Sequence, residues 1–184
     1  DPMDCSVYAG IPFCPTRCAY CSFVSESVER FGEFLPPYLD CLLREVEYTG
    51  KLLRQSGWHV RTLYMGGGTP TTLSAEQMAR LLEAVNTHFD LSRCLEFTVE
   101  GGRPDTLDAE KLRVIKAGGA TRISINPQTM SDTVLKAVGR RHSAASVVDV
   151  FHQAREAGFD DINMDLIAGL PADTADGFAE SLRQ

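Results

Sequence analysis

The chain has 184 residues, of which 43% are hydrophobic and 23% are charged, and its formal net charge is −7 at pH 7. These proportions are typical of a folded domain and exclude disordered, collagen-like and low-complexity classes. The acidic balance provides no basic surface for nucleic acid, and no apolar run is long enough to span a bilayer. We therefore expect one domain over residues 1–184, with no nucleic-acid partner and no membrane span.

Segments of strand and helix character alternate along the chain. An extended segment at 7–11 is followed by a cysteine-rich loop and a helix that Pro36-Pro37 opens and Gly57 ends. A strand at 60–65 then leads into a triple glycine and a helix that begins with the capping box Ser74–Gln77. Further strands are predicted at 95–100, 121–126 and 161–168, and further helices at 108–117 and after Ser131, Ser143 and Thr174.

This alternation predicts an α/β fold with a parallel sheet, either an open doubly wound sheet or a barrel. Polar residues stand at or after the strand ends, among them Glu100, Gln128 and Asp165, and that edge holds the active site in both architectures. Because the chain stops in a helix after its fifth βα unit, we expect it to be a fragment of a longer protein. The methionines Met65, Met78 and Met164 are expected to fill the core.

Three of the six cysteines lie together, with the spacing C-x3-C-x2-C at Cys14, Cys18 and Cys21. The start of the chain has no secretory signal, so we expect a cytoplasmic protein with reduced thiols. Clustered thiolates are soft ligands for an iron–sulfur cluster or zinc, although zinc would need a fourth ligand, and the alternative is three buried or reactive thiols. The isolated cysteines are interpreted as small apolar side chains rather than ligands; these are Cys5, Cys41 and Cys94.

The segment 11–23 around these cysteines resembles the signature of radical S-adenosylmethionine (radical SAM) proteins. More narrowly, the chain resembles the oxygen-independent coproporphyrinogen III oxidase (coproporphyrinogen dehydrogenase) family, and the resemblance covers nearly its whole length. The other matching segments are 66–71, 98–100, 122–128, 139–140 and 165–171. The resemblance implies a partial (β/α) barrel of the radical SAM type, with about five βα units present and the remaining barrel strands and a C-terminal region missing.

The same resemblance implies the residues of the site. Cys14, Cys18 and Cys21 would hold a [4Fe–4S] cluster whose open iron binds SAM, and one electron would split SAM to give a 5′-deoxyadenosyl radical. The positions that match SAM contacts, for one or two SAM molecules, are Tyr8, Tyr20, Gly67, Gly68, Thr69, Glu100, Gln128, Arg140 and Asp165. Taken singly, the triple glycine could be a tight turn, Tyr8 a core residue, Glu100 a helix cap, and Arg140 one of a solvated surface pair with Arg141.

The function implied is that of a haem-biosynthesis oxidoreductase. It would decarboxylate two propionates of coproporphyrinogen III to vinyl groups, giving protoporphyrinogen IX, with an electron donor such as a flavodoxin or ferredoxin. Phe23 stands where established oxidases of the family commonly carry a fourth cysteine, and segments 98–105 and 122–128 resemble the HemZ-like branch. Two alternatives remain, a haem chaperone on the same scaffold and a radical SAM enzyme with another substrate.

Overall fold

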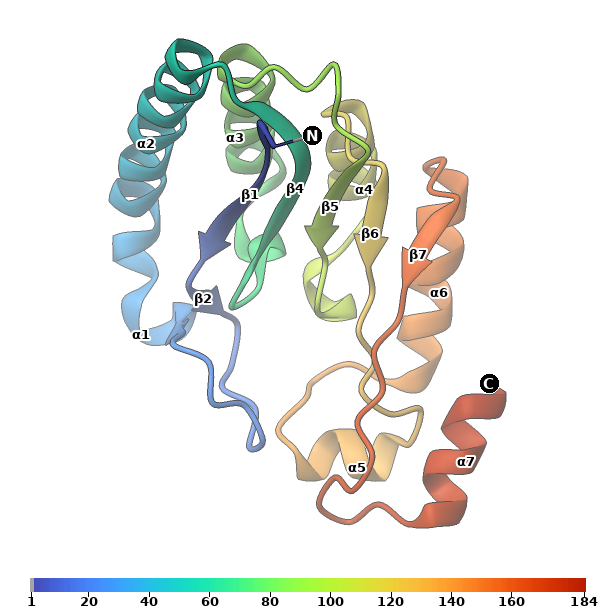
Figure 1. Ribbon diagram of the computed structural model, residues 1–184. Helices are drawn as coiled ribbons and strands as arrows, with labels where there is room; N and C mark the ends of the chain where they lie inside the picture. The colour runs from blue at the N-terminus through green and yellow to red at the C-terminus, as the bar shows by residue number, and fades with distance from the viewer. Residues whose placement is uncertain (1) are drawn as a thin grey trace.

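The computed structural model describes residues 2–184, and within them a five-stranded sheet forms the centre of the fold. The strand order is β1-β4-β5-β6-β7, and each strand runs parallel to its neighbours (Figure 1). The strands are β1 (Asp4–Ile11), β4 (His59–Gly67), β5 (Glu96–Glu100), β6 (Arg122–Ser124) and β7 (Asp161–Asn163). The predicted parallel α/β sheet and its five strands are therefore confirmed.

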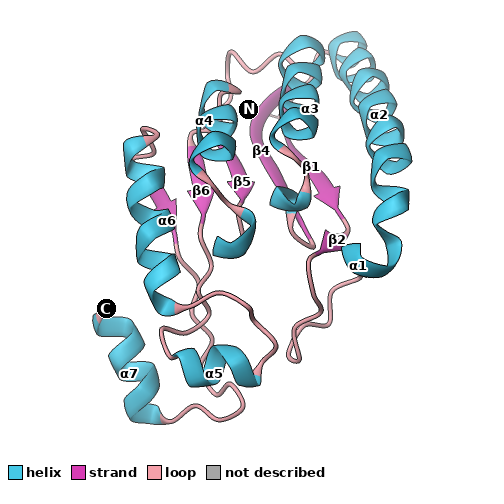
Figure 2. Cartoon of the chain, turned by 180° about the vertical axis from the view of Figure 1, so that it is seen from behind, coloured by secondary structure: helices cyan, strands magenta, loops and turns pink. Residues whose placement is uncertain are grey.

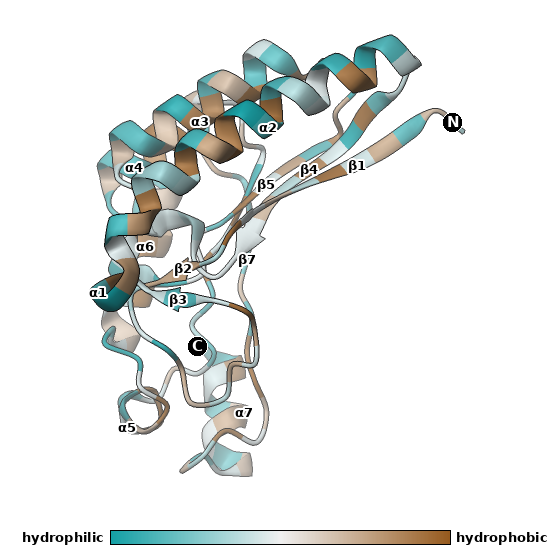
Figure 3. Cartoon of the chain, turned by 90° about the vertical axis from the view of Figure 1, so that its left-hand side faces the viewer, coloured by the Kyte–Doolittle hydropathy of each residue, from teal (hydrophilic) through white to brown (hydrophobic). Residues whose placement is uncertain are grey.

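The connecting helices cover one face of this sheet. They are α2 (Leu35–Ser56), α3 (Ala75–His88), α4 (Ala109–Ala117) and α6 (Ala144–Glu156). Figure 2 shows these four helices in front of the strands, and Figure 3 shows them in profile on a single side of the sheet. A doubly wound sheet carries helices on both faces, so the arrangement is that of a partial barrel.

The core lies between the sheet and this layer of helices. Val99 and Met65 of the strands and Met78 and Leu112 of the helices are fully buried there. Helix α3 begins with the predicted capping box, in which the Gln77 N–H donates to Ser74 Oγ and the Ser74 N–H donates to Gln77 Oε1. These local signals and the apolar spacing agree, which is why the sequence predicts the helices well.

The opposite face of the sheet is polar. Thr62 donates to Ser6 across β4 and β1 at 2.8 Å, and Arg122 on β6 donates to Glu96 and Asn163 on the strands to either side. Parallel sheets are normally apolar on both faces because both are buried. The polar face of this sheet is the one that the layer of helices leaves uncovered (Figure 3).

The last two strands are shorter than predicted. The strands expected at 121–126 and 161–168 end at Ser124 and Asn163, and beyond them only a single bridge pairs Gln128 with Leu166 within the described residues. The chain leaves the ladder because Pro127 has no N–H to donate and Gln128 has a φ of 69°. Met164 therefore follows the strand end and is 40% exposed, so its prediction as a core residue was wrong.

Several short elements surround the carboxyl edge of the sheet, and most of them had no sequence prediction as regular structure. Strands β2 (Phe13–Cys14) and β3 (Glu26–Ser27) form a small parallel pair that brackets the cysteine loop. The remaining elements are α1 (Val28–Phe31), η1 (Gly32–Phe34), η2 (Pro70–Thr72) and η3 (Pro104–Thr106), together with the predicted helices α5 (Asp132–Ala137) and α7 (Ala175–Arg183). Among residues 2–184, no helix combines the length and the apolar character needed to cross a membrane.

Candidate functional site

A pocket opens at the carboxyl ends of the strands, between the cysteine loop and the loops that follow β4, β5 and β6. The empty space in it is about 600 Å³, a figure that includes open solvent. Of the predicted site residues in the described chain, those that line it are Cys14, Cys18, Tyr20, Cys21, Gly67, Gly68, Thr69, Glu100, Gln128 and Arg140. The fold thus brings residues more than 120 positions apart into one cavity.

The cysteine loop is fastened to the sheet at its first cysteine. The Gly68 N–H donates to the Ile11 carbonyl at 2.9 Å and the Thr69 N–H donates to the Phe13 carbonyl at 2.8 Å, so the loop begins against the end of β4. The Thr69 hydroxyl lies 3.5 Å from the Cys14 sulfur. Cys14, Cys18 and Cys21 all carry free thiols, and the backbone presents them to the same pocket.

The glycine turn after β4 allows a very close approach of this loop. A Cβ at Gly68 would lie 2.7 Å from the Phe13 carbonyl oxygen and 3.0 Å from the Cys14 sulfur. A Cβ at Gly66 would lie 2.9 Å from a carboxyl oxygen of Glu100. Side chains at either position would fill the space beside the thiol and the carboxyl, so the triple glycine is more than a tight turn.

Arg140 ties three loops together. Its guanidinium donates to the Tyr20 hydroxyl from Nη2 at 2.8 Å and from Nε at 3.1 Å, and Nη1 donates to the carbonyls of Gly102 and Asn126. Arg141, in contrast, is exposed and forms an ion pair with Glu29. The surface-pair interpretation therefore applies to Arg141 and not to Arg140.

Tyr20 is held between this arginine and a small apolar cluster. Its ring packs beside Val134 and Val138 of the α5 region and Leu170 of the last loop. Burial raises the pKa of Tyr20 to about 12, although Arg140 acts in the opposite direction. The hydroxyl consequently stays protonated at physiological pH and can still donate a hydrogen bond of its own.

Glu100 ends β5 and is the carboxylate of the pocket. Burial, followed by the nearby charge of Asp165, raises the pKa of Glu100 to about 7, although the Gly67 N–H and Arg140 favour its charged form. Near neutral pH this carboxyl therefore exists in both protonation states. It can accept hydrogen bonds from hydroxyl or ammonium groups, or donate one itself.

Three predicted residues need separate description. Gln128 lines the pocket from a buried, left-handed backbone position, and its N–H donates to the Asp165 carbonyl at 2.9 Å. Within the described chain, Asp165 and Tyr8 lie outside the lining. The charge of Asp165 raises the pKa of Glu100, and burial, followed by the charge of Glu100, raises the pKa of Tyr8. Tyr8 is 63% exposed and stacks on Tyr64 on the polar face of the sheet, so its interpretation as a core residue is wrong.

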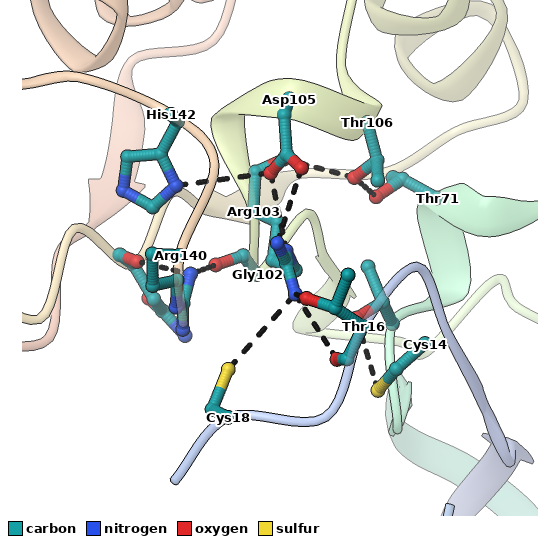
Figure 4. A network of polar contacts seen from close by, with 12 residues as sticks. Cys14, Thr16, Cys18, Thr71, Gly102, Arg103, Asp105, Thr106, Arg140 and His142 are labelled. Atoms are coloured by element: carbon teal, nitrogen blue, oxygen red, sulfur yellow. Dashed lines mark hydrogen bonds and ion pairs between the residues drawn. The ribbon is translucent and has the colours of Figure 1, made fainter. Parts of the chain in front are cut away.

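A buried polar network beside the pocket was missed by the sequence analysis. Figure 4 shows Arg103 between Asp105 on one side and Thr16 and Cys18 on the other, with His142 behind Asp105. Burial alone would raise the pKa of Asp105, but the contacts from His142 and Arg103 hold it well below its usual range. Arg103 and Asp105 of this network lie in segment 98–105, whose resemblance to the HemZ-like branch was noted without a role for the arginine.

The spacing of the thiols also bears on what they could hold. Among residues 2–184, no three His, Cys, Asp or Glu side chains already lie close enough to ligate one metal ion. Cys14, Cys18 and Cys21 nevertheless line one pocket. Cysteine thiolates are the ligands that hold iron–sulfur clusters, so the donor type suits such a cluster.

Comparison with protein families identifies one match. The model of the radical SAM superfamily matches residues 8–184. This match includes the cysteine loop and every strand end that contributes to the pocket.

Two curated bacterial relatives and one solved structure extend this finding. The chain is 42% identical over 180 residues to the oxygen-independent coproporphyrinogen-III oxidase-like protein HemZ and 39% identical over 170 residues to the heme chaperone HemW, both of Bacillus subtilis. These alignments cover 97% and 92% of this chain but 36% and 44% of the relatives. The structure of coproporphyrinogen III oxidase HemN from Escherichia coli matches with a TM-score of 0.86 and 32% identity, over 97% of this chain and 40% of that one.

Proposed function

The chain belongs to the radical SAM superfamily, and on that premise we propose that Cys14, Cys18 and Cys21 bind a [4Fe–4S] cluster beside a SAM molecule in the same pocket. Proteins of this superfamily use both groups. When bound, the cluster and SAM supply one-electron cleavage of SAM and abstraction of a hydrogen atom from the substrate. The observation that supports the proposal is that three free thiols, a glycine turn, a carboxyl and a guanidinium share one cavity.

The residues of the pocket suit the polar groups of SAM. The turn at Gly67 and Gly68 lets the backbone approach a ligand closely, and Glu100 can accept from an ammonium or from ribose hydroxyls. Arg140 fixes Tyr20 at the pocket wall, where its ring offers a flat surface for an adenine. In this proposal the predicted contacts Thr69 and Gln128 line the same cavity, whereas Tyr8 and Asp165 lie outside its lining.

We further propose that the substrate is a porphyrinogen and that the reaction is the oxidative decarboxylation of propionate side chains of coproporphyrinogen III. An external donor such as a flavodoxin or ferredoxin would supply the electron. The proposal draws on the relatedness to HemZ and on the structural match to HemN. The chain spans less than half of each of these proteins, so this activity belongs to the proposal for the whole enzyme.

A second candidate function is haem binding on the same scaffold, with cluster and SAM in a regulatory role. The observation that favours it is the 39% identity to the heme chaperone HemW, close to the 42% identity to HemZ. Both functions use the same cluster and the same pocket. They differ in whether SAM is consumed.

The cofactor proposal is tested by electron paramagnetic resonance (EPR) of the anaerobically reconstituted, reduced protein, with and without SAM. We expect a [4Fe–4S]⁺ signal that changes when SAM is added. A protein that binds no cluster, or a cluster signal indifferent to SAM, would contradict the proposal.

The substrate proposal is tested separately by measuring 5′-deoxyadenosine formation with coproporphyrinogen III and, in parallel, haem binding by absorption titration. Release of 5′-deoxyadenosine that depends on coproporphyrinogen III supports the oxidase. Stoichiometric haem binding without SAM turnover supports the chaperone.

A further inference from the structure

Arg103 is buried beside the cysteine loop, although nothing in the cluster signature includes it. The residue is 2% exposed and precedes the short helix η3. Its guanidinium lies between η3 and the cysteine loop, two segments more than 80 positions apart in the sequence (Figure 4). A buried arginine requires compensating partners, and here they lie on both sides of the guanidinium.

On one side the guanidinium is fixed by a carboxylate. Nε and Nη2 donate to the two carboxyl oxygens of Asp105, each at 3.1 Å, which is the bidentate geometry that holds arginine in one orientation. His142 Nδ1 lies 3.7 Å from the same carboxyl, and its side chain is completely buried. The guanidinium is therefore anchored from behind and cannot swing freely.

On the other side the remaining donor faces the cysteine loop. Nη1 donates to the Thr16 hydroxyl at 2.8 Å and to the Thr16 carbonyl at 3.2 Å, and it lies 3.9 Å from the Cys18 sulfur. Arg140, a half-buried arginine that also lines this pocket, is occupied by Tyr20 and two carbonyls. Arg103 is thus the arginine whose guanidinium lies next to the sulfur of the candidate ligand Cys18.

We propose that Arg103 is a positioning residue that holds Cys18 in place for the cluster and raises the cluster's reduction potential through an N–H···S contact and a fixed positive charge. The inference rests on the proposed function, because it requires that the cluster bind at this loop. Hydrogen bonds to the cysteine sulfurs and the charge near a cluster both set its potential. Because the reduced cluster carries one more negative charge than the oxidised one, a neighbouring cation stabilises the reduced form.

The test measures the midpoint potential by EPR-monitored redox titration of the reconstituted protein and of two variants at this position. We expect Arg103→Gln to lower the equilibrium constant for one-electron reduction about tenfold, which is about 59 mV in potential. Arg103→Lys retains the charge and is expected to recover most of this loss. The matched control is Arg141→Gln, which removes an exposed arginine paired with Glu29 and should leave the potential unchanged.

Each outcome has a defined meaning. Iron and sulfide analysis first establishes whether the wild-type protein carries a cluster, and its absence would overturn the proposed function together with this inference. A cluster whose potential is the same in wild type and in Arg103→Gln would overturn the inference and leave the proposed function intact. A fall in Arg103→Gln that Arg103→Lys restores, with no change in the control, supports it.

A measurement on the unmutated protein keeps the test valid if the variants fail to fold. The chain is labelled with ¹⁵N in the arginine guanidinium groups, and the reduced cluster is examined by pulsed EPR for a ¹⁵N coupling. We expect a coupling from Arg103, whose guanidinium lies beside the sulfur of the candidate ligand Cys18. Arg44 also contacts a cysteine sulfur, but that cysteine is Cys41, which is not a candidate ligand. A cluster without any arginine coupling would overturn the inference.

Discussion

Replacing Glu100 with glutamine should make the stability of the protein less sensitive to a rise in pH from 4.5 to 7. The ordinary pKa of this side chain is 4.5, and its folded-state pKa is about 7 because it is buried and lies near Asp165. When the folded-state pKa of an acid is raised, the unfolded chain releases the proton first as pH rises. Glu100 therefore destabilises the fold progressively between pH 4.5 and pH 7, and this cost is fully present above pH 7.

The magnitude follows from the two pKa values. Each pKa unit corresponds to about 1.36 kcal/mol, so the full difference would be about 3 kcal/mol. Solvent reaches part of the carboxyl and screens its charge, which reduces the expected effect to about 1–2 kcal/mol. Glu100→Gln should be more stable than wild type by this amount at pH 8, and the two should converge at pH 4.5.

The assay is urea unfolding of the cofactor-free protein, followed by circular dichroism at several pH values between 4.5 and 8. Asp165→Asn serves as a second arm, because losing this neighbouring charge should lower the folded-state pKa of Glu100. The loss of stability should then be smaller and should be complete at a lower pH. A stability difference between Glu100→Gln and wild type that stays constant across this range would refute the assignment of a raised pKa to Glu100.

Two further predictions concern the cysteine loop. Gly68→Ala places a Cβ 3.0 Å from the Cys14 sulfur and should cost about 1–3 kcal/mol of stability in urea unfolding while lowering iron content. Gly32→Ala is the control, since its backbone is helical and a Cβ there would meet only the end of the Val28 side chain, at 3.3 Å. Equal losses in both variants would contradict the steric argument. Replacing Cys14, Cys18 or Cys21 with alanine should abolish cluster binding, whereas replacing the exposed Cys41 of α2 should not. Iron and sulfide analysis of each variant measures the cluster content. Equal iron content in all four cysteine variants would contradict the assignment of Cys14, Cys18 and Cys21 as ligands.

The sequence predicts well where several local signals agree. The capping box at Ser74 and the apolar spacing of α3 place that helix, and polar residues after each strand place Glu100 and Gln128 at one edge of the sheet. Parallel topology brings strand ends together whatever the loops do in detail. The candidate site is accessible to sequence reasoning for this reason.

Other features depend on contacts that no local pattern encodes. Arg103 could not be placed because its environment is made by Thr16 and Cys18, far away in the chain. The predicted strand at β7 was too long because the apolar run continues past Asn163. Pairing stops there because the neighbouring strand β6 ends at Ser124. In both cases tertiary context decides, and an arginine in a loop has the same appearance in sequence whether buried or solvated.

The crossing of the loops after β6 and β7 has a mechanical consequence. The Gln128 N–H donates to the Asp165 carbonyl and the Ile167 N–H donates to the Gln128 carbonyl, so two planar peptide groups fasten the loops just beyond the strands. Separating the two loops requires both of these hydrogen bonds to break. The two loops should open in a single event, and their amide protons should exchange with solvent at a common rate.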